Sequence, residues 1–313
     1  YATWALFYSK YLEEYKKEGI DIWGFTVVNE PLGTDSNWES MHFTAEEMSF
    51  FVRNHLGPRL KADGHSVKIL GFDQNRDEEL KKWVDVMYSP EGAPEFFDGT
   101  AVHWYASTYD YFPEALQYAW ERSSGKHLIQ TEACVDAEVP RWMDDAWYWS
   151  KEATDWGYDW APEETRYRHP EYVPVFRYAR DMIGCFNNQV DGWIDWNMVL
   201  NRQGGPNWAE NWCVAPVIVD PERDEVYFTP LYYTIAHFSR YIRPGAVRIG
   251  FSLDDETLMA TAVRNPDGSV AVILFNPTET PRGIALSLGG RSARFRISGK
   301  ALQTIVIPSG INL

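Results

Sequence analysis

The chain has 313 residues, 45% of them hydrophobic and 24% charged, so it can bury a sizeable core and is not a disordered chain. Its formal net charge of −16, from 45 acidic and 29 basic residues, repels polyphosphate and anionic lipid, so we expect neither nucleic acid nor an anionic membrane surface as a partner. Aromatic residues make up 16% of the chain, which favours a binding site where aromatic side chains stack on flat apolar faces such as those of sugar rings.

The cysteines, the hydropathy and the first residues of the chain exclude further classes of protein. Cys134, Cys185 and Cys213 are an odd set at wide spacing, which fits neither a disulfide framework nor a zinc site. No stretch is long and apolar enough for stable membrane insertion, and we predict neither a cofactor nor a metal. The chain opens in the middle of a helix pattern, so we expect a longer protein; a leader on that protein would make it secreted or periplasmic. The oligomeric state stays open.

Helix and strand patterns alternate five times in the first two hundred residues. Each pair is a helix followed by a short apolar strand: Trp4–Glu18 with Ile22–Val28, Ala45–Leu60 with Val67–Phe72, Glu78–Tyr88 with Gly99–Trp104, Pro113–Arg122 with His127–Thr131, and Pro174–Asn188 with Gly192–Asn197. Nearly continuous apolar strands between helices are typical of a parallel sheet that is covered on both faces. We therefore predict an α/β fold for this part.

The segment Asp136–Pro174 interrupts the alternation after the fourth strand and is rich in tryptophan, tyrosine and acidic residues. Because it follows a strand end, it should overhang the top of the sheet as a lid or substrate wall. An aromatic patch at an interface with a partner protein is the alternative. As a wall, the segment should narrow a site toward short substrates.

From residue 243 the pattern changes to short β-like runs. They are Val247–Ser252, Thr257–Arg264, Val270–Asn276, Arg282–Leu288, Ser292–Ile297 and Leu302–Ile307. Turn signals such as Asn265-Pro-Asp-Gly268 separate them. We predict an antiparallel β-sandwich here, which divides the chain into domains at 1–242 and 243–313.

Polar residues follow the apolar strands, where a parallel barrel has its active-site face. They are Asn29-Glu30 after the first strand, His103-Trp104-Tyr105 at the third, Thr131-Glu132 at the fourth and Asp195-Trp196-Asn197 at the fifth. A carboxylate at the tip of a buried strand is costly unless it is paired or hydrogen-bonded. A lone glutamate there is more often a salt-bridge partner than a catalyst, but Glu30 and Glu132 together match the two carboxyl groups that glycoside cleavage needs.

These residues lie in segments that resemble glycoside hydrolase family 30, the family of acid β-glucosidase (glucosylceramidase). The segments are Val27-Val-Asn-Glu-Pro31, Ala101-Val-His-Trp-Tyr105, Thr131-Glu-Ala-Cys-Val135, Gly192-Trp-Ile-Asp-Trp-Asn197, Asn201-Arg-Gln-Gly-Gly-Pro-Asn-Trp208 with Asn211, Ala215-Pro-Val-Ile-Val-Asp220 and His237-Phe-Ser-Arg-Tyr-Ile-Arg-Pro-Gly245. Together they span most of residues 1–276.

The resemblance implies a (β/α)8 TIM barrel with a C-terminal β-sandwich. It also implies a retaining β-glycosidase that acts through a covalent glycosyl-enzyme intermediate on β-glucosidic or related β-linked bonds. Glu30 would be the acid/base at the end of the fourth barrel strand, and Glu132 the nucleophile at the end of the seventh. The substrate would be a carbohydrate or a glycolipid, as in carbohydrate or sphingolipid metabolism.

The resemblance further implies residues that bind the substrate or hold the glutamates. Asn29 would bond the sugar 2-hydroxyl, Trp196 would form the sugar platform and Asn211 would line the pocket. His103 and Tyr105 would orient the nucleophile and hold the acid. We also count Trp104 and Asn197, which flank these positions, as substrate-binding residues.

The chain departs from the family pattern at its start. If Ile22–Val28 is the fourth barrel strand, strands 4–8 are present and the first three βα units are missing, which would leave strand edges that soluble proteins avoid. We therefore expect a fragment of a longer protein. The alternatives are a non-catalytic carbohydrate-binding remnant, and specificity for β-1,6-glucan or β-xylosides.

Overall fold

The computed structural model describes residues 1–33, 41–107, 110–136, 143–150, 173–206 and 213–310. They form two compact units. The first comprises Tyr1–Ser107, Tyr111–Ala133 and Asn188–Trp196, and the second comprises Thr108–Asp110, Cys134–Asn187 and Asn197–Leu313. The boundary that the sequence suggests between residues 242 and 243 stays a prediction.

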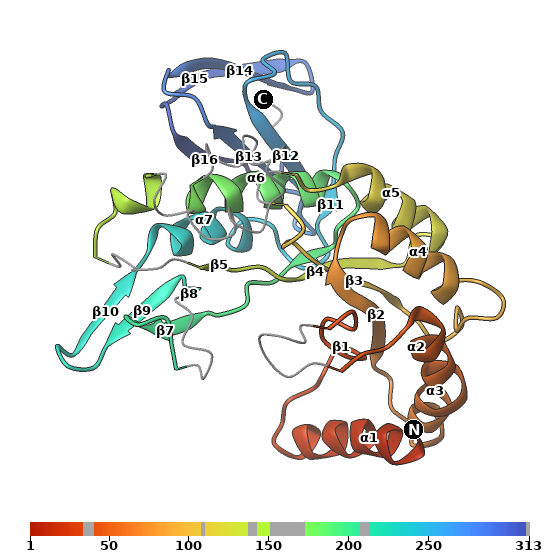
Figure 1. Ribbon diagram of the computed structural model, residues 1–313. Coiled ribbons are helices and arrows are strands. Elements are labelled where there is room, and N and C mark those ends of the chain that lie inside the picture. Colours follow the sequence, from red (N-terminus) through yellow and green to blue (C-terminus); the bar gives the residue numbers. More distant parts are fainter. Residues whose placement is uncertain (34–40, 108–109, 137–142, 151–172, 207–212, 311–313) are drawn as a thin grey trace, which may run out of the picture. The chain divides into compact units, whose positions relative to one another are not determined.

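The first unit is built on a parallel sheet of five strands. In spatial order they are β1 (Gly24–Thr26), β2 (Lys68–Asn75), β3 (Gly99–His103), β4 (His127–Glu132) and β6 (Gly192–Trp193). The spatial order equals the chain order, as Figure 1 shows. Because parallel crossovers are right-handed, the helices that connect β1 to β4 lie on one face of the sheet, whereas the sequence pattern predicted cover on both faces, and all strands end at the same edge. The predicted α/β architecture is confirmed.

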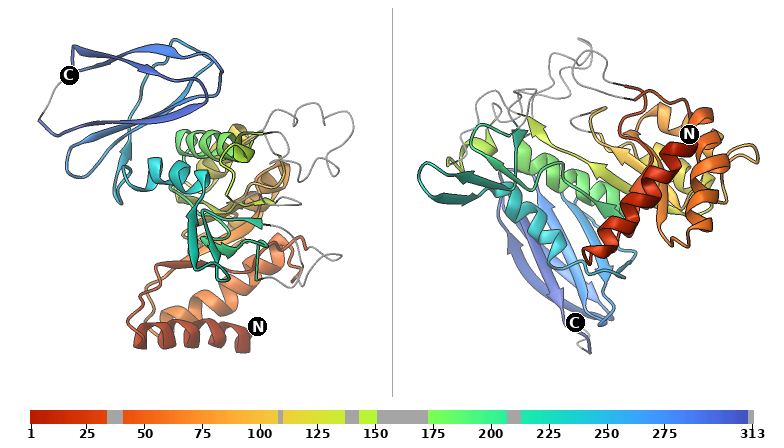
Figure 2. Two further views of the ribbon diagram at one scale, coloured as in Figure 1. Left: turned by 90° about the vertical axis from the view of Figure 1, so that its left-hand side faces the viewer. Right: turned by 90° about the horizontal axis from the view of Figure 1, so that it is seen from below.

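The helices of this unit follow one another along the sheet (Figure 2). They are α1 (Ala2–Lys17), α2 (Ala45–Phe51), a π-helical turn at Val52–Leu56, α3 (Gly57–Ala62), α4 (Glu78–Met87) and α5 (Pro113–Arg122). The helix predicted at Ala45–Leu60 is thus a continuous run of three pieces. It begins with a capping box, in which Thr44 and Glu47 satisfy each other's backbone N–H groups.

Three strands differ from the apolar runs that predicted them. β1 ends at Thr26 rather than Val28, because the chain bends away before Glu30, whose φ is +45°. β6 ends at Trp193 rather than Asn197. β2 continues to Asn75 instead of ending at Phe72, because a bulge between Phe72 and Gln74 keeps it paired with β3.

The second unit contains short elements that the sequence analysis did not predict. They are β5 (Val135–Asp136), β7 (Val199–Asn201), β8 (Cys213–Val214), β9 (Val217–Asp220), β10 (Glu225–Phe228) and α7 (Pro230–Ser239), beside α6 (Pro174–Asn187) and a 3-10 turn at Trp147–Trp149. β10, β9 and β7 form one sheet, and β5 pairs with β8. Cys134 and Cys213 are buried in the small core between these strands.

The C-terminal strands form the predicted antiparallel sandwich. β11 (Val247–Arg248), β12 (Met259–Arg264), β13 (Val270–Asn276) and β16 (Ala301–Ile307) make one sheet, and β14 (Arg282–Leu288) with β15 (Arg291–Ile297) makes the other (Figure 1). Ala260 and Leu274 of the first sheet pack against Ile297 and Ile284 of the second. This shared apolar layer holds the two sheets face to face.

The predicted lid at Asp136–Pro174 falls mostly on residues 137–142 and 151–172, which lie outside the described residues. Within the described stretch, Trp147 and Tyr148 are buried and pack edge to face, as core residues do. No helix in the described part of the chain combines the length and the hydropathy needed to cross a membrane.

Candidate active site

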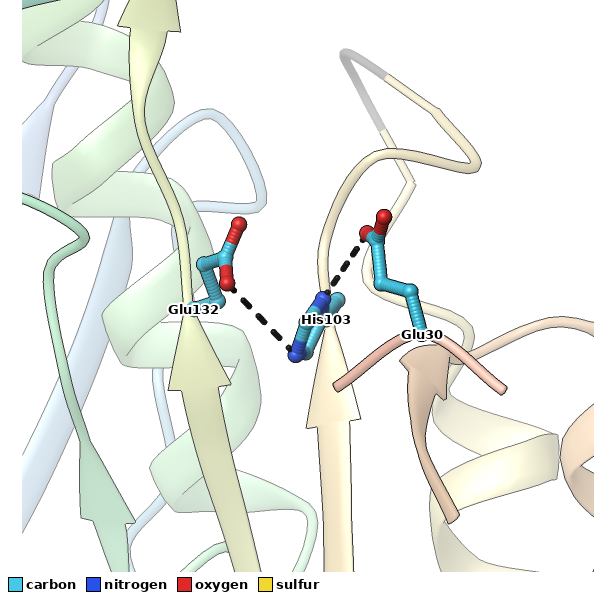
Figure 3. A group of neighbouring side chains, drawn as sticks. All are labelled: Glu30, His103 and Glu132. Carbon is cyan, nitrogen blue, oxygen red and sulfur yellow. Dashed lines mark hydrogen bonds and ion pairs between the residues drawn. The ribbon is translucent and has the colours of Figure 1, made fainter. Parts of the chain in front are cut away.

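Three ionisable side chains meet at the carboxyl edge of the parallel sheet (Figure 3). Glu30 lies in the turn after β1, His103 is the last residue of β3 and Glu132 is the last residue of β4. Their side chains point toward one another, with the imidazole of His103 between the two carboxylates. The edge is the one at which parallel barrels place their chemistry, so these sequence predictions converge on one site.

The separation of the two carboxyl groups is short. One oxygen of Glu30, one oxygen of Glu132 and one ring nitrogen of His103 all lie within 4.8 Å of one another. Retaining glycosidases hold their carboxyl groups about 5–5.5 Å apart, whereas inverting enzymes need about 6.5–9.5 Å to admit a water molecule. The spacing therefore matches attack by one carboxylate directly on the sugar.

The backbone around Glu30 is held in a left-handed conformation, with φ +45°. Its N–H donates to the carbonyl of Asp73 at 3.0 Å, and its own carbonyl accepts from Gly33 at 2.8 Å. The hydroxyl of Tyr8 on α1 donates to the carbonyl of Val27 just upstream. Left-handed geometry in a non-glycine residue persists only where the surroundings enforce it, and it concentrates at functional sites.

His103 is buried and faces carboxylates with both ring nitrogens. Nδ1 is 3.1 Å from Oε1 of Glu30, and Nε2 is 3.1 Å from Oδ1 of Asp73 and 3.9 Å from Oε2 of Glu132. Burial alone would lower the pKa of His103, but the hydrogen bonds to Asp73 and Glu30 outweigh it and raise the pKa to about 10. The residue is therefore an imidazolium at neutral pH, and both nitrogens donate.

The protonation of His103 determines whether Glu30, His103 and Glu132 fit a metal site or acid–base chemistry. The atoms of Glu30, His103 and Glu132 are close enough to surround a cation. A metal requires a ring nitrogen with a free lone pair, and an imidazolium offers none. The positive charge of His103 already compensates the carboxylates, so the arrangement fits acid–base chemistry.

Glu132 is the second glutamate of the site and is partly buried. Burial raises its pKa to about 7, and the nearby Glu30 adds to this, while His103 and a hydrogen bond from Tyr105 oppose it. The Tyr105 hydroxyl donates to Oε1 at 3.0 Å. Near neutral pH Glu132 therefore exchanges its proton readily, and a retaining mechanism requires one protonated and one ionised carboxyl group in such a pair.

Replacing Glu132 with glutamine should stabilise the fold at pH 8. The pKa of about 7 in the folded protein lies above the ordinary glutamate value of 4.5, so the carboxyl group contributes stability that is present below pH 4.5 and is lost as the pH rises through 7. The neutral amide avoids this loss, which amounts to about 3 kcal/mol. Urea unfolding should show the full gain at pH 8 and almost none at pH 4. An equal gain at both pH values would contradict the raised pKa.

Residues at the end of β2 brace the segments that carry the site. The side chain of Asn75 accepts from the backbone N–H of Tyr105 at 2.8 Å, and the N–H of Arg76 donates to the carbonyl of His103 at 3.2 Å. The guanidinium of Arg76 donates to Gln130, whose amide in turn donates to the carbonyl of Glu132. β2 thus fixes the ends of β3 and β4.

The remaining predicted residues are placed differently. Asn29 is exposed beside Glu30, and Trp196 is 55% exposed, with its backbone N–H bonded to the carbonyl of Ala133 at 2.8 Å. Trp104 is only 1% exposed and packs edge-on against Trp193, so in this structure it supports the sheet instead of offering a face to a sugar. Asn197 belongs to the second unit, and Asn211 lies outside the described residues.

The sequence analysis missed Asp73, Arg76 and Gln130. Asp73 contacts His103 directly, while the other two support the backbone at Glu132. A signal was present, because four polar residues, Asp-Gln-Asn-Arg at 73–76, follow an apolar run as they do at the other strand ends.

Family models and relatives agree with this geometry. The glycosyl hydrolase family 30 TIM-barrel domain matches residues 1–242, and the glycosyl hydrolase family 30 beta sandwich domain matches residues 245–305. The lysosomal acid glucosylceramidase of Mus musculus is 32% identical over 278 residues, which are 88% of this chain and 49% of that protein.

Solved structures show the same similarity. SrfJ from Salmonella typhimurium superposes with a TM-score of 0.82 at 28% identity, over 98% of this chain and 62% of that one. The endo-β1,6-glucanase BT3312 superposes with a TM-score of 0.78 at 28% identity, over 96% of this chain and 61% of that one. The chain spans about half the length of the mouse relative.

Proposed function

The chain belongs to glycosyl hydrolase family 30, and from this premise we propose that it is a retaining β-glycosidase with a covalent glycosyl-enzyme intermediate. The family's TIM-barrel and β-sandwich models cover the α/β part and the antiparallel part of the chain, as the predicted fold requires. The observation that carries the proposal is the pair of glutamates, Glu30 buried and Glu132 partly buried, with one oxygen of each within 4.8 Å of the other beside one imidazolium. That spacing suits direct attack and leaves no room for an intervening water.

In the proposed mechanism Glu30 acts as the general acid and Glu132 as the nucleophile. Glu132 attacks the anomeric carbon while Glu30 gives its proton to the leaving oxygen, so one C–O bond forms as the other breaks. Glu30 then takes a proton from water, whose oxygen attacks the anomeric carbon and releases Glu132. Two inversions at the same carbon give retention. The Tyr105 hydroxyl orients Glu132 for the attack, and the imidazolium of His103 stabilises its charge beforehand.

Hydrolysis of a panel of aryl β-glycosides, β-xylosides included, and of β-1,6-glucan tests the proposal. The first-formed sugar, observed by proton NMR before mutarotation, should be the β-anomer. An α-anomer as first product would refute retention. Binding of glucosides without turnover would instead favour a carbohydrate-binding remnant.

Within this activity we propose a β-glucoside as the substrate, because the mouse relative is named as an acid glucosylceramidase. A β-1,6-linked glucan is the second candidate, since the superposable structure BT3312 is described as an endo-β1,6-glucanase. Aryl β-glucosides and octyl glucoside should be cleaved faster than long β-1,6-glucan. Internal cleavage of the polymer would favour the second candidate.

Replacing Tyr105 with phenylalanine should move the acidic side of the pH–activity profile upward. The variant removes the hydroxyl that donates to Oε1 of Glu132 at 3.0 Å, so the ionised form loses a hydrogen bond and its pKa rises above about 7. At pH 6 we expect kcat/KM to fall by about 10-fold.

The matched control is Tyr118→Phe. The Tyr118 hydroxyl also donates to a carboxylate, Asp85, at 2.9 Å, but between α5 and α4 on the surface of the same unit. Its pH profile should equal that of the wild type. An unchanged profile in Tyr105→Phe would show that Tyr105 does not stabilise the nucleophile.

A further inference from the structure

Asp73 occupies a strained position in the middle of β2. Asp73 and its neighbour Phe72 have φ values of +60° and +74°, so two consecutive non-glycine residues are left-handed. The side chain of an L-residue crowds its own backbone in this conformation, so each such residue is strained. They form the bulge that shifts the register of β2 against β3. Strain of this kind persists where a side chain must be aimed at a site.

The bulge directs the Asp73 side chain at His103. Asp73 is only 5% exposed. Its Oδ1 lies 3.1 Å from Nε2 of His103 and accepts a hydrogen bond from the Thr131 hydroxyl at 2.7 Å. The Asp73 carbonyl accepts from the backbone N–H of Glu30 at 3.0 Å. Asp73, His103 and Glu30 therefore close a ring of three hydrogen bonds, because Nδ1 of His103 lies 3.1 Å from Glu30.

We propose that Asp73 is a positioning residue that keeps His103 doubly protonated and fixed between Glu30 and Glu132, and thereby sets the pH range in which the site works. The role in catalysis rests on the proposed function, whereas the effect on His103 does not. Among the described residues, Asp73 bonds the backbone N–H of Glu30 but neither glutamate side chain, so it acts through the imidazole.

Charged groups reach His103 from every strand beside it. Glu30 comes from the turn after β1, Asp73 from β2 and Glu132 from β4, while the ring of Tyr105 lies edge-on at 6.1 Å. The guanidinium of Arg76 is turned to Gln130, although its backbone N–H bonds to the His103 carbonyl. Of the interactions that raise the pKa of His103 against burial, the hydrogen bond that it donates to Asp73 has the largest effect.

Loss of the Asp73 charge should therefore weaken the hydrogen bond that His103 donates to Glu30 and raise the pKa of Glu132. With a neutral partner at residue 73, only Glu30 and Glu132 oppose the effect of burial, so the pKa of His103 falls and the ring loses its proton at a lower pH, closer to the range in which Glu132 titrates. A neutral imidazole can donate a hydrogen bond from one nitrogen only, so His103 can then donate either to Glu30 or to residue 73, but not to both. Glu132 also loses a nearby positive charge that lowers its pKa, and its ionisation moves to higher pH.

Asp73→Asn tests this with two independent readings. In a titration of labelled histidine by NMR, His103 of the wild type should stay protonated beyond pH 9, and in the variant it should titrate lower by about 1–3 units. In the pH–rate profile the acidic limb should move upward, and kcat should fall by about 10- to 100-fold while KM changes little.

Asp191→Asn is the matched control. Asp191 lies 2.6 Å from Nδ1 of His127, an exposed pair near the amino end of β4, away from the catalytic edge. This variant should leave the His103 titration and the pH–rate profile unchanged.

The outcomes separate the two proposals. If His103 of the folded wild type titrates near 6.5, or if Asp73→Asn leaves its titration unchanged, the inference about Asp73 is overturned whatever the activity. If the wild type has no glycosidase activity but His103 responds as expected, the proposed function fails and the electrostatic role of Asp73 stands. A wild-type titration near 6.5 overturns the inference even if the variant does not fold.

Discussion

Glu132→Gly should lose essentially all hydrolysis, with kcat lower by a factor of about 10⁴ or more, because the covalent step has no nucleophile. Sodium azide should restore turnover, since the small anion can occupy the space that the carboxylate leaves. It would attack the anomeric carbon from the same side as Glu132, with Glu30 still protonating the departing oxygen. The product should be the α-glycosyl azide, detectable by NMR.

Glu132→Gln is the control for this experiment. It should be as inactive as the glycine variant, but azide should not rescue it because the amide fills the same space. A β-glycosyl azide from Glu132→Gly would exchange the two roles, making Glu132 the acid/base. That alternative has a physical basis, since burial raises the pKa of Glu132 to about 7. Product stereochemistry distinguishes the two assignments directly.

Glu30→Gly should give an effect that depends on the leaving group. Substrates with a poor leaving group need protonation, and their kcat/KM should fall by about 10³- to 10⁴-fold. Dinitrophenyl glycosides leave without protonation, so their first step should be nearly unaffected and the intermediate should accumulate. Azide would then attack the glycosyl-enzyme and give the β-glycosyl azide. Glycine also removes the cost of the left-handed backbone at this position, where φ is +45°.

The leaving-group series itself supplies the control for Glu30. The wild type should show a weak dependence of kcat/KM on the pKa of the leaving phenol, and the variant a steep one. Equal loss of activity on all aryl glycosides would mean that Glu30 is not the proton donor. Loss of folding is checked by the unfolding midpoint in urea.

The sequence could predict where chemistry lies because the parallel strands are short, apolar and followed by polar residues. That pattern places Glu30, His103 and Glu132 on one edge, and the structure brings them together. Among the sandwich strands, β13 and β14 match the β-like runs residue for residue, whereas β11 ends at Arg248 instead of the predicted Ser252. In both cases local patterning and long-range packing agree.

The sequence could not predict what depends on long-range contacts. The bulge in β2 adds a residue to the strand, and no local pattern distinguishes it from a strand that ends at Phe72. The sequence therefore did not predict that the Asp73 side chain contacts His103. The pairing of β5 with β8 joins two-residue strands that are far apart in the chain, and β10 is largely exposed, so neither carries a hydrophobic period.

The most direct measurement is to trap the covalent intermediate. An activated 2-deoxy-2-fluoro-β-glucoside slows the second step, and the protein should gain the mass of one fluoroglucosyl group. After peptic digestion the label should lie on the peptide that contains Glu132. A label on the peptide that contains Glu30, or turnover of the reagent to an α-configured sugar without any labelled protein, would contradict the account.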